Sequence, residues 1–430
     1  MKGYRRAMTY PKIHIVIVGG GFGGVACVRA CAKRFARRPD VAITLITPRP
    51  FHEFAPALYV GASEIDATQC ADHGLPRAGS DQAGEAGHAV ENALCMPLED
   101  ILRGTRVKTV YGYVRKVDVR ARTVSVDHHA PLHYSYLVLA MGCEMDYFDI
   151  PGLAAHAYPL KTVKDAMRLR GALERCMRKT GGMVVIGGGG FTGAELAAEL
   201  AWVAKCRGYP VRIVLVEGLT PVLAQLGEKA SGMARARLIQ LGVELAEGAR
   251  VQAVEGGEGG RVTVRLNNQQ THEADLVVWT GGVRGNRLYQ HMFPIYTGTQ
   301  WRVGVEESLQ VVGEKNIFAV GDGAYLETNK FPKGLPLQAR VAIEEGKCAA
   351  ENIARMTEGR PLRSFSCAQL PYVIPLGGRF AVAVYRGRVR RGFLPWIFKQ
   401  AIELRYFVEV LGWRKGLQYW MREEKMCVSE

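Results

Sequence analysis

The stretch IGGGGFTGAEL, Ile186 to Leu196, decides the fold of this chain, because a close counterpart, VGGGFGGVAC, stands at Val18 to Cys27. Each glycine run follows a short apolar segment, IHIVIV or MVVI, and precedes alanine-rich sequence. This order predicts a strand, a tight glycine turn and a helix, built twice. Both runs keep the spacing G-x-G-x-x-G, and its glycines are Gly19, Gly21 and Gly24 in the first run and Gly188, Gly190 and Gly193 in the second.

The three glycines of such a turn have separate physical roles. The first allows the tight turn, the second lets a pyrophosphate approach the backbone, and the third lets helix and strand pack closely. The helix N-terminus then favours the phosphate charge. One such motif also occurs in ordinary glycine turns, whereas two in matching context predict two dinucleotide sites.

The residue that ends the second strand of each unit distinguishes the two sites. VRIVLVE ends in Glu217, whose carboxylate can accept both hydroxyls of an adenosine ribose and would repel a 2′-phosphate. The second site should therefore prefer NADH to NADPH. VAITLIT ends in Thr47, which is either a weaker ribose partner or simply the last residue of a strand.

The composition indicates a globular protein with an anionic partner. The 430 residues are 48% hydrophobic and 23% charged, which suits two or three domains. Lys and Arg exceed Asp and Glu by 56 to 41, giving a net charge of +15, so nucleic acid or an anionic membrane surface must be considered. The ten cysteines include no C-x-x-C pair, so we predict no metal site, no redox dithiol and reduced, cytosolic thiols. No signal peptide and no membrane-spanning segment is expected.

The order of the segments predicts an α/β fold with two Rossmann-like dinucleotide-binding domains and a C-terminal membrane-associating segment. The first domain should comprise residues 11–159 and 285–368, with the second, residues 160–284, inserted into it. Residues 369–430 should form a hairpin followed by amphipathic helices. A polar, glycine-rich stretch between Asp66 and Glu91 is interpreted as a mobile surface loop.

The C-terminal segment is basic and then amphipathic. Helical spacing places one apolar stripe along it and a tryptophan-rich continuation after Gly412, the pattern of a helix that lies in a membrane interface. The stripe could instead cover the protein's own core or a dimer partner. The basic residues are Arg386, Arg388, Arg390 and Arg391, the stripe is Ile397, Ala401, Leu404, Val408 and Leu411, and the continuation is Trp413, Leu417 and Trp420.

Several further segments give the chain a family resemblance. With YPLKTVKDAMRLR, ADLVVWTGGVRGN, IFAVGDGA and GFLPWIFKQAIEL, it resembles the type II NADH dehydrogenases, the single-subunit NADH:quinone oxidoreductases among the flavoproteins with two dinucleotide-binding domains. The resemblance implies FAD on the first glycine turn, with Asp322 at the ribityl-phosphate region, and NADH on the second turn with Glu217. It implies hydride transfer from NADH to FAD and two electrons to a membrane quinone, without proton pumping.

The resemblance also implies locations and roles. Glu195 would lie where hydride passes, although it could merely complement the helix dipole. The protein would be peripheral on the cytoplasmic side of the cell membrane, with no nucleic-acid partner and with a homodimer as an open alternative.

Some residues depart from the family pattern. In ARVAIEEG, Arg340 and Glu344 stand where the family has glutamines that border the quinone pocket, so we group them with Glu195 as candidate catalytic residues. At i, i+4 they could instead simply pair with each other. Cys143 replaces the usual serine, which invites comparison with the sulfide:quinone oxidoreductases.

Three alternatives therefore stay open at the level of sequence. One is a soluble NADH-dependent flavoprotein reductase of a small redox protein, and another is a sulfide:quinone oxidoreductase-like enzyme. The third is a nucleotide-sensing scaffold with structural FAD, against which the intact second motif with Glu217 argues.

Overall fold

The computed structural model describes residues 12–65, 90–292, 299–367 and 371–427, so the loop expected after Asp66 lies outside the described residues. The chain separates into two compact units. The first unit comprises Met1–His52, Pro97–Glu144 and Val283–Ala368, and the second comprises Glu53–Met96, Met145–Gly282 and Gln369–Glu430. The two units are defined by compactness and not by nucleotide binding. The domain boundaries expected from the nucleotide-binding pattern therefore stay a prediction.

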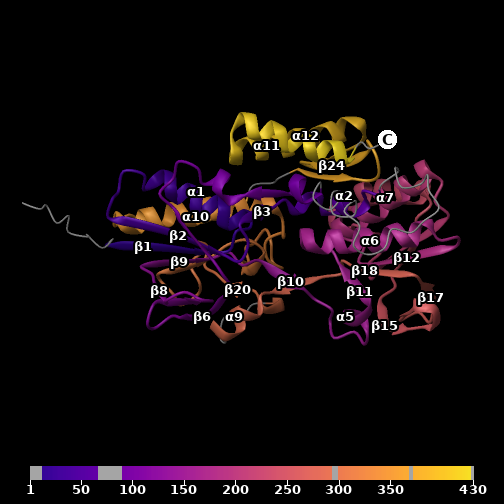
Figure 1. Ribbon diagram of the computed structural model, residues 1–430, viewed down its shortest axis with the longest axis horizontal. Coiled ribbons are helices and arrows are strands. Elements are labelled where there is room, and N and C mark those ends of the chain that lie inside the picture. The colour runs from indigo at the N-terminus through magenta and orange to yellow at the C-terminus, as the bar shows by residue number, and fades with distance from the viewer. Residues whose placement is uncertain (1–11, 66–89, 293–298, 368–370, 428–430) are drawn as a thin grey trace, which may run out of the picture. The chain divides into compact units, whose positions relative to one another are not determined.

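A five-stranded parallel sheet forms the centre of the first unit. Its order is β21 (Ile317–Ala319), β9 (Tyr136–Leu139), β1 (Ile13–Val18), β2 (Val41–Thr47) and β5 (Lys108–Tyr111). The β-branched run of β1 suits a strand buried on both faces. Helices α1 (Phe22–Arg34) and α10 (Ala339–Thr357) pack together beside this sheet (Figure 1). A small antiparallel sheet completes the unit, with β6 (Val114–Asp118), β7 (Thr123–Val126) and β8 (Leu132–His133).

The second unit repeats this design. Its parallel sheet has the order β11 (Ala157–Pro159), β18 (Leu276–Trp279), β12 (Gly182–Gly187), β13 (Val211–Glu217) and β14 (Glu244–Glu247). Strand β12, which leads into the glycine turn, lies between β13 and β18. In the first sheet, β1 likewise leads into a glycine turn and lies between β2 and β9. The doubled sequence motif therefore predicted a doubled topology correctly. The helices of this unit include α2 (Leu58–Ser63), α6 (Val163–Arg178), α7 (Phe191–Arg207) and α8 (Glu228–Leu241).

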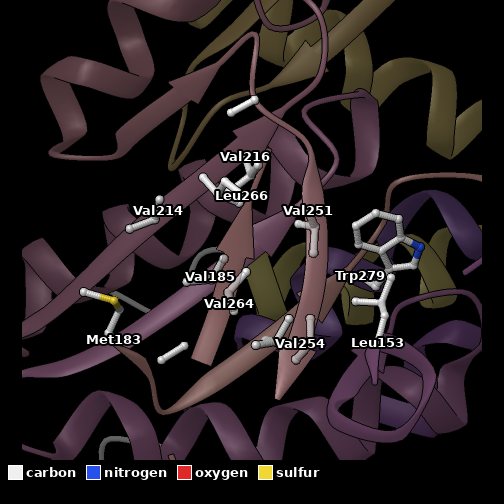
Figure 2. Packing of buried hydrophobic residues seen from close by; sticks show 13 residues of the cluster. Leu153, Met183, Val185, Val214, Val216, Val251, Val254, Val264, Leu266 and Trp279 are labelled. Atoms are coloured by element: carbon white, nitrogen blue, oxygen red, sulfur yellow. The ribbon is translucent and has the colours of Figure 1, made fainter. Parts of the chain in front are cut away.

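A valine-rich core joins the parallel sheet of the second unit to an antiparallel one. The antiparallel sheet consists of β15 (Val251–Gly256), β16 (Val262–Leu266) and β17 (Thr271–Ala274). Val185, Val214 and Val264 are at most 1% exposed in this cluster, and Trp279 also belongs to it (Figure 2).

The C-terminal segment is part of the second unit. It forms a three-stranded antiparallel sheet and then a helical hairpin. The sequence predicted a hairpin of two strands, so the third strand of the sheet was not expected. Its elements are β23 (Tyr372–Pro375), β24 (Ala381–Tyr385), β25 (Arg388–Gly392), α11 (Phe393–Leu411) and α12 (Trp413–Cys427). Arg237 of α8 holds this segment, because its guanidinium donates to the carbonyls of Leu376 and Gly377 and lies 4.6 Å from the Phe380 ring.

Within the described ranges, no helix combines the length and the apolar character needed to cross a bilayer.

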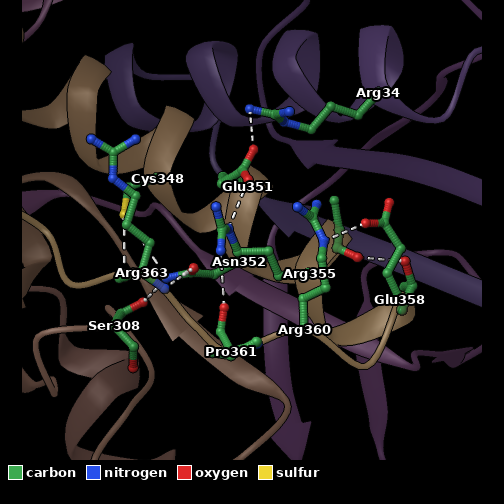
Figure 3. Close-up of polar contacts among 12 residues, drawn as sticks. Arg34, Ser308, Cys348, Glu351, Asn352, Arg355, Glu358, Arg360, Pro361 and Arg363 are labelled. Atoms are coloured by element: carbon green, nitrogen blue, oxygen red, sulfur yellow. Dashed lines mark hydrogen bonds and ion pairs between the residues drawn. The ribbon is translucent and has the colours of Figure 1, made fainter.

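A buried amide fixes the end of α10 in the first unit (Figure 3). Asn352 is fully buried; its Nδ2 donates to the carbonyls of Ser308 and Arg363 at 2.9 Å each, and its Oδ1 accepts from the Arg363 amide at 2.8 Å. The preceding residue, Glu351, pairs with Arg34 of α1 at 2.5 Å. Asn352 therefore attaches the chain before and after α10 to that helix, and Glu351 attaches α1 to it.

We expect Asn352→Ala to lower the free energy of unfolding by about 2–3 kcal/mol, because it leaves buried backbone groups without partners. Chemical denaturation would measure the loss. The exposed pair of Arg360 and Glu358 in the same cluster provides the control, and Glu358→Ala should change stability by less than about 0.5 kcal/mol. An equal loss in both variants would contradict the role given to Asn352.

Candidate functional site

The first glycine turn joins β1 to α1 and leaves the helix N-terminus open. Gly19 has φ of +114°, and a Cβ on Gly24 would overlap the Gly19 carbonyl oxygen, so both positions require glycine. A Cβ on Gly21, the N-cap, would instead meet nothing within 4 Å. The first turn of α1 contains no acidic residue. This geometry leaves room and a favourable dipole for a phosphate at Gly21.

The side chains of Thr47 and His52 lie against this turn at Gly20. Thr47 is 4% exposed, and its hydroxyl lies 3.0 Å from where a Cβ on Gly20 would stand. The same hydroxyl accepts a 3.4 Å hydrogen bond from the Arg49 amide. Nδ1 of fully buried His52 lies 2.8 Å from the Gly20 carbonyl, and burial lowers the pKa of His52 to about 4. A neutral His52 therefore donates to Gly20 at neutral pH.

Asp322 lies in a short 3-10 turn after β21, and three side chains hold that turn. The Asp322 carbonyl accepts hydrogen bonds from the Cys143 thiol and from Nε of Arg302, each at 2.9 Å. The preceding Gly321 amide donates to Oε2 of Glu345 at 2.5 Å. Burial raises the pKa of Glu345, which is 2% exposed, to about 8. The backbone of the turn is thus fixed, while the Asp322 carboxylate is partly exposed.

The second glycine turn repeats the first in the second unit. Gly188 has φ of +103°, a Cβ on Gly193 would overlap the Gly188 carbonyl oxygen, and a Cβ on the N-cap Gly190 would meet nothing within 4 Å. A cavity of about 440 Å³ opens beside it. Its wall continues the core of Figure 2, because Val216, Val251 and Trp279 belong to both.

Glu217 lies in this cavity at the end of β13, where the sequence placed it. Its Oε2 accepts from the Gly189 amide at 2.6 Å and its Oε1 accepts from the Leu219 amide at 2.8 Å. The carboxylate is therefore held in one orientation by the glycine turn itself. A ribose diol would meet a fixed acceptor, and a 2′-phosphate would meet a fixed negative charge.

Glu195 and Glu199 form an unexpected acidic pair on α7. Burial raises the pKa of Glu195 to about 8; the charge of Lys399 lowers it, whereas that of Glu403 raises it. Burial likewise raises the pKa of Glu199 to about 7, opposed by a hydrogen bond from the Gly378 backbone and by Lys399. Glu195 lies in the second turn of α7, not the first, so dipole complementation does not explain it.

The cation of this cluster comes from the C-terminal helix α11. Lys399 and Glu403 are 7% and 4% exposed and form an ion pair of 2.5 Å, and the Lys399 ammonium lies 5.7 Å from the Tyr59 ring centroid. Of the three carboxyl groups, Glu403 is buried, whereas Glu195 and Glu199 are half-buried by exposed area. With its pKa raised to about 8, the Glu195 carboxyl group retains its proton at neutral pH.

Arg340 and Glu344 lie on one face of α10 in the first unit and form an ion pair of 3.2 Å. Their side chains are 42% and 40% exposed, and Lys347 lies 3.6 Å from the same carboxylate. The structure thus shows the simple pairing that the i, i+4 spacing allows. A catalytic role for either residue stays a prediction.

The comparisons with known proteins agree with this geometry. Residues 13–346 match the family described as pyridine nucleotide-disulphide oxidoreductase. The chain belongs to this family. A type II NADH:quinone oxidoreductase of Staphylococcus saprophyticus is 25% identical over 95% of this chain and 100% of its own length. Another from Mycobacterium tuberculosis is 28% identical over 93% of this chain and 85% of its own length.

Two solved structures share the fold of this family member. NDH2 of Plasmodium falciparum in complex with NADH has a TM-score of 0.78 and 17% identity, covering 97% of this chain and 99% of that one. A sulfide:quinone oxidoreductase of Aquifex aeolicus has a TM-score of 0.73 and 21% identity, covering 93% and 91%. The Rossmann-like fold expected from the sequence is confirmed.

The sequence analysis missed Glu199, Lys399 and Glu403. Two signals were available: acidic residues at i, i+4 on an otherwise apolar α7, and a Lys–Glu pair at i, i+4 inside an aromatic helix. Both patterns also occur on solvated helix faces, so the sequence did not show that they face each other.

The two turns generate a matched set of glycine substitutions. We expect Gly24→Ala and Gly193→Ala to lower the free energy of unfolding by about 3 kcal/mol or more, because the methyl group overlaps a backbone carbonyl. Gly21→Ala and Gly190→Ala should cost about 1 kcal/mol or less, since both N-caps have ordinary φ values of −77° and −73°. Thermal denaturation without added nucleotide would measure all four. Equal losses at all positions would refute this geometry.

Proposed function

We propose that this protein is a single-subunit NADH:quinone oxidoreductase that binds FAD in the first unit and NADH in the second. The observation that carries the proposal is the doubled glycine turn, open at Gly21 and at Gly190 and supplemented by Glu217 in only the second copy. The similarity to relatives named type II NADH:quinone oxidoreductases along almost the whole chain supports it.

The first unit suits FAD. Gly19, Gly21 and Gly24 hold its pyrophosphate against the N-terminus of α1, and the Asp322 carboxylate binds near the ribityl phosphate. Thr47 is the ribose partner, a weaker one than Glu217 because a neutral hydroxyl forms weaker hydrogen bonds than a carboxylate. When bound, the flavin supplies the redox chemistry, taking a hydride from NADH and passing two electrons to quinone.

The second unit suits NADH. Gly188, Gly190 and Gly193 hold the pyrophosphate at α7, and Glu217 accepts the hydroxyls of the adenosine ribose. Glu195 lies in the second turn of α7, the helix that follows this glycine turn. It supplies a carboxyl group that carries a proton at neutral pH. Reduction of a quinone to quinol takes up two protons, so a buried acid with this property is useful to the second half-reaction.

Association with an anionic membrane surface is the role we propose for α11. Part of the stripe expected from the sequence is exposed: Ile397 is 43% exposed and Ala401 is exposed, whereas Leu404, Val408 and Leu411 are half-buried. Leu394, outside that stripe, is 77% exposed, while Lys399 and Glu403 are buried. Water-exposed apolar residues over buried charged ones are the reverse of a solvated helix and suit contact with lipid. The arginines of the hairpin from Tyr385 to Gly392 are exposed beside it in sequence and favour anionic headgroups.

The finer expectations belong to the same proposal. The protein is peripheral on the cytoplasmic side of the cell membrane, nucleic acid is not a partner, and a homodimer is an alternative use of the exposed stripe. The FAD-binding domain comprises residues 11–159 and 285–368, the NADH-binding domain comprises residues 160–284, and residues 369–430 make the membrane contact.

The alternatives have less support. Cys143, which suggested a sulfide:quinone oxidoreductase, donates its thiol hydrogen to the Asp322 carbonyl, and among the cysteines whose side chains the structure describes no disulfide is formed. A soluble reductase would not need the outward apolar stripe of α11. A scaffold with structural FAD would not need the fixed Glu217.

The direct test of the proposal is a pair of half-reactions under anaerobic conditions. NADH should bleach the yellow flavin, NADPH should do so at least about tenfold less efficiently because of Glu217, and a soluble quinone should restore the colour. Stopped-flow absorbance measures each step. A flavin that bleaches but is not reoxidised by quinone would favour the soluble reductase, and a colourless protein that binds no FAD would refute the assignment.

Glu195→Gln tests the proton supply. In the native protein, the rate of quinone reduction should fall as pH rises through about 8, because the Glu195 carboxyl loses its proton there. The variant should lose this pH dependence and slow quinone reduction by about 10–100-fold. Flavin bleaching by NADH serves as the control and should stay nearly unchanged, since that step takes up no proton from solvent. An unaltered pH profile would show that Glu195 is not the donor.

Charged substitutions on α11 test the membrane contact. Leu394→Glu and Ile397→Glu should each weaken binding to anionic phosphatidylglycerol vesicles by roughly tenfold, the effect of losing one buried aliphatic side chain and adding a charge. Ile239→Glu provides the control, because Ile239 is 48% exposed on α8 of the same unit. Vesicle co-sedimentation measures the binding. Unchanged binding in the α11 variants would indicate that another surface makes the contact.

A further inference from the structure

The adenosine end of the NADH cavity contains a cation as well as Glu217. Arg250, directly before β15, lines the cavity with Glu217, Gly218 and Leu219. Its guanidinium is exposed, and among the described residues no ion pair joins it to Glu217, whose two oxygens accept the backbone hydrogen bonds of Gly189 and Leu219. A fixed carboxylate and an available guanidinium thus share one end of the cavity.

The backbone of Arg250 is fixed on both sides. Its amide donates to Oδ1 of Asn267 at 2.8 Å, and its carbonyl accepts from the Asn267 amide at 2.9 Å. The side chain then crosses the backbone that follows β13. A Cβ on Gly218 would stand 3.1 Å from both Cγ and Nε of Arg250, so the absence of a side chain at position 218 gives the arginine its path. This close approach places the arginine side chain beside Gly218, the residue between Glu217 and Leu219.

The two side chains favour opposite nucleotides. A carboxylate accepts the ribose hydroxyls and repels a 2′-phosphate, whereas a guanidinium binds phosphate with two parallel hydrogen bonds and also stacks on an adenine ring. While the Glu217 carboxylate repels a 2′-phosphate, the arginine can only stack on the adenine ring. Once the carboxylate charge is removed, the same arginine can receive a 2′-phosphate.

We propose that Arg250 is the second specificity-determining residue of this cavity: it binds the adenosine half of NADH, and it gives the site a capacity for NADPH that Glu217 suppresses. The inference rests on the proposed function of the second unit as the NADH site. It adds that the choice of nucleotide depends on the balance between two side chains, one on each side of Gly218.

The test measures binding of oxidised nucleotides, which cannot reduce the flavin. Isothermal titration of the FAD-loaded protein with NAD⁺ and NADP⁺ gives the dissociation constants. Glu217→Gln should tighten NADP⁺ binding by about tenfold or more, and adding Arg250→Gln to that variant should abolish the gain. Arg250→Lys in the same background should keep only part of it, because an ammonium lacks the planar fork.

Two single variants make the test independent of the folding of the Glu217 variant. Arg250→Gln alone should weaken NAD⁺ binding several-fold through loss of the adenine contact. Arg265→Gln is the matched control, because Arg265 is an exposed arginine on β16 outside the cavity, paired with Glu255 at 3.0 Å. It should leave both dissociation constants unchanged.

The outcomes separate this inference from the proposed function. If NAD⁺ binds the native protein but the NADP⁺ gain of Glu217→Gln survives Arg250→Gln, or if Arg250→Gln alone leaves NAD⁺ binding unchanged, Arg250 does not contact the nucleotide and the inference is overturned. If the native protein binds neither nucleotide, the proposed function of the second unit fails and the inference fails with it.

Discussion

The structure depends on one contact made twice, the passage of a helix backbone directly over a strand-end carbonyl. Gly24 covers the Gly19 carbonyl oxygen and Gly193 covers that of Gly188, at distances that a single methyl group would make impossible. Because α1 and α7 can lie this close to the ends of β1 and β12, their open N-termini point into the space above the sheet. The strand order around each turn, the place of Thr47 and Glu217, and the position of the cavity beside Gly188 all follow from that approach.

The two copies have diverged in how the turn is supported. In the first unit, a neutral buried histidine, His52, contacts the carbonyl of the loop, and a hydroxyl lies under it. In the second, the Glu217 carboxylate accepts directly from the Gly189 amide. The same backbone is thus stabilised from its carbonyl in one copy and from its amide in the other. Only the second arrangement places a carboxylate against the turn, so the structural support and the preference for NADH that we propose have one origin.

The sequence predicted what depends on local pattern. Strand, glycine turn and helix can be read from a dozen residues, so both Rossmann-like sheets and the place of Glu217 were accessible. The pairing of Arg340 with Glu344 was accessible for the same reason, since i, i+4 spacing on a helix is a local relation. What could not be predicted involves contacts between distant segments: Lys399 beside Glu195, Arg250 against Gly218, and Asn352 on the chain at Arg363. Each is an ordinary polar residue in its own stretch, and its significance comes from neighbours that only the tertiary fold brings to it.

Both charged and apolar residues of α11 face the interior of the second unit. Lys399 and Glu403 are buried on the same helix as Trp396, Phe407 and Val410, whereas Leu394 and Ile397 are exposed. Burying an ion pair is unfavourable unless neighbouring groups compensate it, and the Tyr59 ring, 5.7 Å from the Lys399 ammonium, supplies part of that compensation. Phe407 of the same helix packs 4.6 Å from Phe54, so α11 is part of the second unit's core and is not a detachable appendage. Lys399 and Glu403 thus shift the pKa of Glu195 and lie on the buried face of a helix whose exposed residues include Leu394 and Ile397. The proton supply proposed for Glu195 and the membrane contact proposed for α11 therefore both depend on how this one helix packs.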